Sequence, residues 1–191
     1  MTAEELRGEL DARGALLRGH FRLSSGRHSD RFIQKFRILE DPRIVESAAA
    51  EIVGRCASYR PTIVVSAAVG GIVLGYETAR QLGLKAIFVE KEGGVPTLRR
   101  GFALTPEDRV LVVEDVVTTG GSVREVLDVV RSHGAQVAAV GVIIRRGEAD
   151  FGVPTVALLE YPADSCDPSA CPQCAAREPL SEPGSRFMLK N

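Results

Sequence analysis

Short apolar runs rich in Val and Ile recur along the middle of the chain. These runs predict five strands, at residues 62–65, 85–90, 110–113, 137–144 and 153–159. Apolar residues at helical spacing predict helices over 72–82 and 122–133, which end at Gly83 and Gly134. Strands that are apolar throughout and alternate with helices are typical of a parallel sheet covered on both faces. The pattern therefore predicts an α/β fold with a central parallel sheet of about five strands.

The N-terminal part of the chain has a weaker pattern. Leucines recur near helical spacing over residues 3–17, which predicts a helix there. The polar stretch SSGRHSD (24–30) predicts a turn between two short strands. Asp41 and Pro42 are the residue types preferred at a helix N-cap and at the first helical position, so a helix is expected over 43–59.

The length of 191 residues fits a single domain, 1–191. Within it we expect an N-terminal hood segment (1–40), a core (41–161) and a C-terminal tail (162–191). The tail is rich in Pro, Ser, Asp and Cys, a composition that predicts an irregular segment or lid.

Three notable segments each follow a predicted strand: 66–71, 90–101 and 114–122. Right-handed crossovers bring the carboxyl ends of parallel strands to one edge of the sheet. We therefore expect the three segments to gather at that edge, and we expect the polar segment 90–101 to be a mobile loop that excludes water.

The segment VLVVEDVVTTGGS (110–122) carries the most informative chemistry. Two acids, Glu114 and Asp115, follow a buried strand, and a loop of hydroxyl residues and glycines then leads into a helix. Backbone N–H groups of such a loop and the helix N-terminus can bind a phosphate, whereas ionised acids suit the hydroxyls of a ribose. The competing interpretation is a turn that serves packing alone. Neither G-x-G-x-x-G nor a Gly-Lys-Ser/Thr phosphate loop is present in the segment.

Composition and charge narrow the class of protein. Hydrophobic residues make up 45% and charged residues 26%, as in a packed soluble domain. The net charge of −1 argues against nucleic acid as a partner. No apolar run has the roughly 20 residues of a membrane helix, and MTAEELRGEL is no signal peptide. We expect a cytoplasmic protein that acts on small molecules.

Residues 110–122 resemble the signature of the type I phosphoribosyltransferases, which bind phosphoribosyl pyrophosphate (PRPP) and have a Rossmann-like fold. Four further stretches, 21–35, 64–79, 97–102 and 141–146, resemble orotate phosphoribosyltransferases, so the likeness spans the whole chain. The segment Ser-Gly-Arg-x-Ser followed by an aromatic residue is characteristic of the orotate enzymes, and the Cys-containing tail resembles that of some bacterial forms.

The resemblance implies transfer of ribose 5-phosphate from PRPP to orotate, which gives orotidine 5′-phosphate and pyrophosphate in pyrimidine (UMP) biosynthesis. It implies catalytic roles for Asp115, Glu114 and Lys91. The residues implied in PRPP binding are Glu114, Asp115, Val116, Val117, Thr118, Thr119, Gly120, Gly121, Ser122, Lys91, Arg99 and Arg100. Those implied in orotate binding are Thr118, Arg146, Ser25, Gly26, Arg27 and Phe32. The resemblance also implies a homodimer, and a Mg²⁺ cofactor held mainly through PRPP with no protein ligand assigned.

The sequence departs from the family pattern at several positions. Gly70 stands where many members have a lysine, and Ser24 stands where a lysine often precedes Ser-Gly-Arg. The segment EKEGGVPTLRR replaces the usual Arg-Lys-x-x-Lys-x-His loop, so we assign the clamp on pyrophosphate to Lys91, Arg99 and Arg100. Solvated loop charges are the alternative. Lys35 is not assigned as a replacement for either missing lysine.

Cys166, Cys171 and Cys174 have a spacing that resembles metal ligands, but only three are local, and a structural zinc normally takes four. A fourth could come from Cys56 or from a partner subunit, and a disulfide within the tail is the alternative. Among the histidines, His28 lies close to the expected substrate segment, His133 fits a helix C-terminus, and His20 has no distinguishing context.

Two other functions stay open from the sequence. One is a phosphoribosyltransferase that uses a purine, xanthine or uracil, because a fold does not fix the base. The other is a regulatory protein that senses PRPP without catalysis, for which the altered segment 90–101 is the only support.

Overall fold

The structure is a computed structural model that describes residues 1–23, 25–162 and 164–183. Ser24, discussed above, lies outside the described residues, as does the chain from residue 184. Within the described residues, six strands form the main sheet, in the order β5-β4-β3-β6-β7-β8. Their bounds are β3 Ile63–Ala67, β4 Lys85–Glu92, β5 Val95–Leu98, β6 Arg109–Val117, β7 Gln136–Arg145 and β8 Thr155–Glu160. All but β5 pair in parallel, which confirms the five predicted parallel strands.

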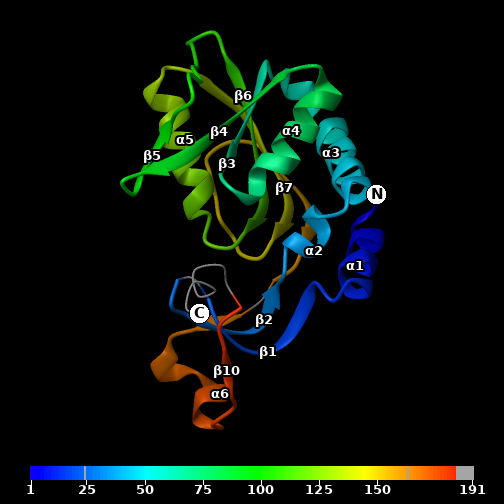
Figure 1. Ribbon diagram of the computed structural model, residues 1–191, viewed down its shortest axis with the longest axis vertical. Helices are drawn as coiled ribbons and strands as arrows, with labels where there is room; N and C mark the ends of the chain where they lie inside the picture. The colour runs from blue at the N-terminus through cyan, green and yellow to red at the C-terminus, as the bar shows by residue number, and fades with distance from the viewer. Residues whose placement is uncertain (24, 163, 184–191) are drawn as a thin grey trace.

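Helices cover both faces of the main sheet (Figure 1). One face packs against α3 (Pro42–Cys56) and α4 (Gly70–Leu82), and the other packs against α5 (Gly121–Ser132). Successive side chains of a strand point to opposite faces, so each strand supplies both cores. Val64 and Leu111 lie in the core beneath α3 and α4, whereas their neighbours Val65 and Val112 lie in the core beneath α5.

The strand order creates a crevice at one edge of the sheet. The chain leaves β3 to form β4 on one side and then crosses to form β6 on the other side. Ligands of open α/β sheets bind outside the carboxyl ends of the two strands that flank such a reversal. The segments that follow β3 and β6 therefore lie where a site is expected.

A second, smaller sheet forms the hood. It joins β1 (Leu16–Arg22), β2 (His28–Ile33), β9 (Ser165–Cys166) and β10 (Leu180–Ser181) in the order β10-β1-β2-β9. The prediction of an irregular tail is thus wrong for the segment 165–181, which also contains η2 (Pro168–Ala170) and α6 (Pro172–Ala175). Figure 1 shows this hood below the carboxyl edge of the main sheet.

The helix predicted over 3–17 is shorter than expected. Helix α1 runs over Ala3–Ala12, Gly14 has φ +61°, and the last part of the predicted segment belongs to strand β1. A capping box between Thr2 and Glu5 begins the helix. Leucines at helical spacing could not reveal this end, because they continue into a strand that also needs apolar residues.

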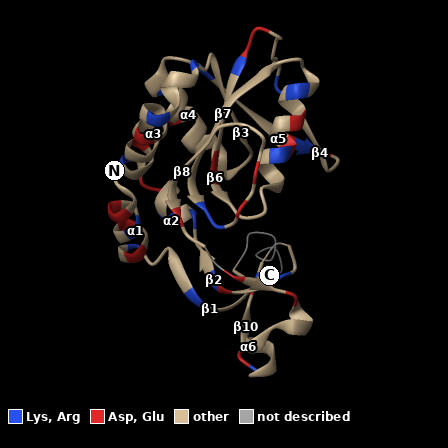
Figure 2. Ribbon diagram, turned by 180° about the vertical axis from the view of Figure 1, so that it is seen from behind, with Lys and Arg blue, Asp and Glu red and all other residues tan. Residues whose placement is uncertain are grey.

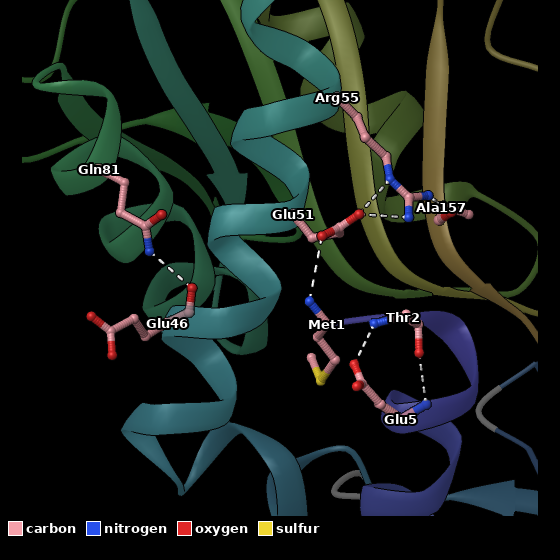
Figure 3. A network of polar contacts seen from close by, with 8 residues as sticks. All are labelled: Met1, Thr2, Glu5, Glu46, Glu51, Arg55, Gln81 and Ala157. Atoms are coloured by element: carbon pink, nitrogen blue, oxygen red, sulfur yellow. Dashed lines mark hydrogen bonds and ion pairs between the residues drawn. The ribbon is translucent and has the colours of Figure 1, made fainter.

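Helix α3 fixes the N-terminus to the sheet (Figure 3). The Met1 amine lies 3.4 Å from Glu51 Oε2, and Arg55 binds Glu51 and donates to the Ala157 carbonyl of β8 at 3.4 Å. The predicted caps are confirmed, since Asp41 Oδ1 accepts from the Arg43 amide at 3.0 Å and Gly83 ends α4 in the left-handed region.

The segment 90–101, predicted to be a loop, is largely a β-hairpin. Strand β4 extends to Glu92 and pairs antiparallel with β5. Gly93 and Gly94 both have positive φ, as a two-residue hairpin turn requires. Two further elements, α2 (Phe36–Leu39) and η1 (Ala57–Tyr59), flank α3. Within the described residues no helix has the length and apolar character needed to span a bilayer.

Candidate active site

The acid pair lies at the crevice between β3 and β6. Glu114 and Asp115 are 6% and 1% exposed, close to the carboxyl end of β6. The start of α4 passes directly over them, because a side chain at Gly70 would collide with Asp115 Oδ2 and a Cβ at Gly71 would lie 3.3 Å from Glu114 Oε1. The expected meeting of segments 66–71 and 114–122 is therefore confirmed. Figure 2 shows acidic residues on β6, with other charged residues spread over the helices, the loops and the hood.

Lys35, which precedes α2 in the hood segment, is the counter-ion of this pair. Its Nζ lies 2.8 Å from Asp115 Oδ2 and donates to Oδ1 at 3.0 Å. The space for Lys35 exists because Gly70 has no side chain, since a Cβ there would lie 2.6 Å from Nζ. Sequence reasoning missed this contact. The signal that could have found it was the coincidence of a glycine in place of the family lysine with an unassigned lysine at 35.

Burial makes Glu114 a weak acid. Loss of water raises the pKa of Glu114 to about 8, and the negative charge of Asp115 contributes to this rise, while Lys35 opposes it. Glu114 Oε1 accepts from the Asp115 amide at 3.1 Å, and Asp115 Oδ1 accepts from the Val116 amide at 2.6 Å. Near neutral pH the burial of Glu114 therefore favours its protonated form.

The loop 118–122 leads into helix α5 as the phosphate interpretation requires. Gly120 is the N-cap with φ +79°, and α5 begins at Gly121, so the first N–H groups of the helix have no partner within it. Gly120 also serves packing, because a Cβ there would lie 2.7 Å from Phe151 Cε1. Conformation and close packing therefore both require glycine, and the packing interpretation does not exclude the phosphate one.

A cavity of about 440 Å³ lies next to this loop. It is lined by the loop at 67–69, by the hairpin β4–β5 and by the first turns of α5, including Ser122 and Glu125. Lys91 also lines the cavity, with its Nζ 2.7 Å from Glu125 Oε1. Arg99 and Arg100 are not among the lining residues: each pairs with an acid of β4, at 3.2 Å to Glu92 and 3.0 Å to Glu90. Of the three proposed cations, the structure brings only Lys91 to this cavity.

Arg146 joins the core to the hood. It is 7% exposed, its amide donates to the Val117 carbonyl at 2.8 Å, and its Nη2 donates to Ser29 Oγ at 3.3 Å and to the Arg31 carbonyl at 3.0 Å. Its Nε is buried and has no hydrogen-bond partner among the described residues. A buried donor without a partner is unfavourable, so an acceptor such as a water or a ligand oxygen would stabilise it.

Four other residues expected to contact the base lie in the hood. Arg27 donates from Nε to Ser165 Oγ at 2.9 Å, and Phe32 packs on Phe21 with ring centroids 5.8 Å apart. Ser25 and Gly26 form the turn between β1 and β2, where Gly26 has φ +82°. The hood contacts of Arg146 come instead from Ser29 and Arg31, which sequence reasoning did not select.

The model of the phosphoribosyl transferase domain family matches residues 37–152, and the fold is that of this family. A curated orotate phosphoribosyltransferase from Pelotomaculum thermopropionicum is 48% identical over 97% of this chain and 99% of its own. The crystal structure of orotate phosphoribosyltransferase from Aeropyrum pernix has a TM-score of 0.70 and 32% identity over 81% of this chain and 93% of its own. An adenine phosphoribosyltransferase structure from Thermoanaerobacter pseudethanolicus, with a TM-score of 0.68 over 84% of this chain and all of its own, is 16% identical and shows the fold alone.

The chain therefore belongs to the orotate phosphoribosyltransferase family, as its sequence pattern predicted. The relatives do not favour the two alternatives considered above, another acceptor base or a regulatory protein without catalysis.

Proposed function

We propose that the protein transfers the ribose 5-phosphate group of PRPP to orotate, giving orotidine 5′-phosphate and pyrophosphate. One observation carries the proposal: a buried acid pair and the N-terminus of α5 follow one another at the point where the sheet reverses its order. The carboxylates of the acid pair can accept hydrogen bonds from a diol, and the N–H groups at the start of α5 can donate to a phosphate. The two sets of groups are separated by one short loop, and they suit the two ends of a ribose 5-phosphate.

Asp115 and Glu114 accept hydrogen bonds from the ribose hydroxyls in this proposal. Thr118, Thr119, Gly120, Gly121 and Ser122 donate to the 5-phosphate, with Val116 and Val117 supplying backbone on the approach. As the bond from C1′ to pyrophosphate breaks, positive charge develops on the sugar, and the carboxylate of Asp115 stabilises it. Lys35 must then give up part of its contact with Asp115, because the same carboxylate faces both groups.

Lys91, which lines the cavity beside Ser122, binds the pyrophosphate group of PRPP in this proposal. Its ion pair with Glu125 is half exposed and is therefore weak enough to exchange for a phosphate oxygen. Arg99 and Arg100 pair with acids of β4. In this proposal they bind the pyrophosphate as well, but only after the β4–β5 hairpin has moved.

Mg²⁺ fits the oxygen chemistry of this site. The two carboxylates are hard oxygen donors, and Asp115 Oδ2 is buried with no hydrogen bond among the described residues, although Lys35 lies beside it. Held mainly through PRPP, Mg²⁺ would neutralise the charge of the leaving pyrophosphate. Glu114 can act as a metal ligand only once it has lost the proton that its burial retains.

Arg146 is proposed to bind the anionic oxygens of orotate, using the Nε donor that has no partner among the described residues. Thr118 and the turn Ser25–Gly26–Arg27 complete the base site, and Phe32 supports it through Phe21. A ring nitrogen of orotate forms the new bond to C1′ as the bond to pyrophosphate breaks, and it loses its proton. This proton is acidic, so little general-base catalysis is needed.

The assembly is proposed to be a homodimer. Helix α4 and the preceding loop expose Val69, Val73 and Tyr76, which are 49–72% exposed at helical spacing. This apolar stripe suits a second copy of the chain, in line with the family resemblance. The cytoplasmic location expected from the sequence stays a prediction.

The test is loss of orotate absorbance in the presence of PRPP and Mg²⁺, compared with adenine, xanthine and uracil as acceptors. We expect turnover with orotate alone. Asp115→Asn should lower kcat by at least about 100-fold, the scale of one lost electrostatic contact in a transition state, while leaving the circular dichroism spectrum unchanged. Turnover of another base with orotate inert would refute the assignment of substrate, and an active Asp115→Asn would refute the role of the acid.

A further inference from the structure

Four metal-binding side chains meet in the hood, away from the acid pair. His20 lies on β1, His28 on β2, Cys171 just before α6 and Cys174 within α6. One ligand atom from each lies within 4.8 Å of all the others. His20, His28 and Cys171 are buried, and Cys174 lies nearer the surface. None of the four has a role in the proposed transfer reaction.

The distances match a tetrahedral site. Zinc bonds of about 2.0–2.1 Å to nitrogen and about 2.3 Å to sulfur place neighbouring ligand atoms about 3.3–3.8 Å apart at tetrahedral angles. His28 Nδ1 lies 3.3 Å from Cys174 Sγ, and His20 Nε2 lies 3.5 and 3.6 Å from the sulfurs of Cys171 and Cys174. The two ring nitrogens, His20 Nε2 and His28 Nδ1, are 2.9 Å apart, a few tenths of an ångström closer than two nitrogens on one zinc ion, and the remaining pairs lie within 4.8 Å.

Surrounding groups orient the ligands. His20 Nδ1 lies 3.0 Å from the Glu178 carbonyl, which can only accept, so Nδ1 carries the proton and the lone pair of Nε2 faces the cluster. A hydrogen bond from the second nitrogen of a ligating imidazole to a carbonyl is the usual outer contact of a metal site.

The other cysteines are less suited to the site. Cys56 is buried in the core around α3, among Ala48, Ala49 and Ile52. Cys166 pairs with His28 across β9 and β2, and its Sγ lies 3.8 Å from the His28 carbonyl. All four cysteines are free in the structure. Two histidines of the N-terminal strands thus take the places of Cys166 and of the fourth ligand sought from the sequence.

We propose that His20, His28, Cys171 and Cys174 bind one structural Zn²⁺ ion that ties the C-terminal tail to the N-terminal strands. Four protein ligands leave no open position, so the ion stabilises and does not catalyse. The hood needs such a link because two of its four strands, β9 and β10, are only two residues long. A small layer with few buried side chains gains stability from a metal that its core cannot supply.

The test is the zinc content of full-length protein purified without a histidine tag and dialysed against metal-free buffer. We expect about one zinc per chain in the wild type and at most about a tenth of that in Cys174→Ser, by elemental mass spectrometry. Cys166→Ser and Cys56→Ser are the matched controls and should keep the full amount. Zinc retained by Cys174→Ser but lost from Cys166→Ser would overturn the proposed ligand set.

A measurement on the wild type alone covers the case in which Cys174→Ser fails to fold. Protein stripped of metal and loaded with Co²⁺ should show thiolate-to-cobalt charge-transfer absorption and the visible bands of a tetrahedral ion. Wild-type protein without zinc and without these bands would overturn the proposal. So would a disulfide between Cys171 and another tail cysteine in protein prepared under nitrogen.

Discussion

At the scale of single residues, the site is governed by the burial of two adjacent acids beside one lysine. Asp115 keeps Lys35 at 2.8 Å, and Glu114 keeps a proton because its pKa is raised to about 8. Removing water raises the free energy of the charged form of a carboxyl group, and one lysine cannot neutralise two carboxylates.

Glu114→Gln should flatten the pH dependence of stability. The pKa of Glu114 is about 8 in the folded protein and near 4.5 when exposed, so the folded state holds one more proton between these values. The free energy of unfolding then falls as pH rises from about 4.5 to about 8, and it levels off above that. The glutamine amide cannot ionise, so the variant should be the more stable protein above about pH 8 and should differ less near pH 5. Asp115 and Lys35 are present in both proteins.

Urea unfolding at several pH values and one fixed protein concentration measures this difference. Parallel stability curves for the two proteins would show that Glu114 is ionised in the folded state across the whole range.

Arg146→Ala should weaken orotate binding more than PRPP binding. A hydrogen bond to a charged group contributes about 1.5–3 kcal/mol, so we expect the KM for orotate to rise about 10- to 150-fold. The KM for PRPP should change by less than about threefold, because the acid pair and the α5 N-terminus are untouched. Arg145→Ala is the control, since Arg145 pairs with Glu160 instead. Equal losses for both substrates in Arg146→Ala would remove its role as a base contact.

At the scale of elements, strands and turns set the distances between these groups. The end of β6 places the acids, the turn into α5 places the phosphate donors, and the start of α4 passes over Asp115. Gly70 is the tightest point, because any side chain there would meet Asp115 and Lys35 together.

Gly70→Ala should therefore damage the site without unfolding the chain. The new methyl group must displace the Asp115 carboxylate or the Lys35 ammonium, so we expect at least a tenfold loss of kcat/KM for PRPP, which corresponds to about 1.4 kcal/mol. Gly54→Ala is the matched control, because Gly54 lies in α3 with open space around it. That change should stabilise the protein by about 0.5–1 kcal/mol and leave activity intact. Steady-state kinetics with varied PRPP and thermal unfolding compare the two, and an active Gly70→Ala would show that the contact is not needed.

The sequence predicted these elements where one strong pattern dominated. Continuous apolar runs located all five parallel strands, and Gly83 and Asp41 located helix ends, because these signals are local. Strand β5 was missed because Val95–Leu98 is short, contains a proline and lies at the edge of the sheet. Strands β9 and β10 were missed because two residues carry no period.

Contacts between residues far apart in the sequence could not be predicted, because they give no local pattern. Lys35 and Asp115 are 80 positions apart, and His20 and Cys171 are 151 apart. The residue types of segment 114–122 were enough to predict a phosphorylated sugar as its ligand. The partners of Arg146 and of the tail cysteines could not be predicted, because they depend on how the hood packs on the core.

At the scale of the whole molecule, the apolar stripe of α4 connects assembly to the active site. Val69 belongs both to this stripe and to the lining of the cavity beside Lys91. A second copy packed on the stripe would therefore hold the loop after β3 in place. This predicts a dimer that sediments at about twice the 20.5 kDa of one chain.

Tyr76→Arg should convert that dimer to a monomer at low micromolar concentration. Tyr76 is 68% exposed in the single chain, and a charge buried in an apolar contact without a partner costs several kcal/mol, enough to weaken association more than about 100-fold. Asp128→Arg is the control, because Asp128 lies exposed on α5, on the opposite face of the sheet. Sedimentation velocity over a range of concentrations measures both variants. A wild type that sediments as one chain, or a Tyr76→Arg protein with unchanged association, would mean that the stripe is not the contact between subunits.

If the dimer forms through this stripe, the activity of Tyr76→Arg should fall on dilution in step with dissociation, because the loop beside the cavity loses its support.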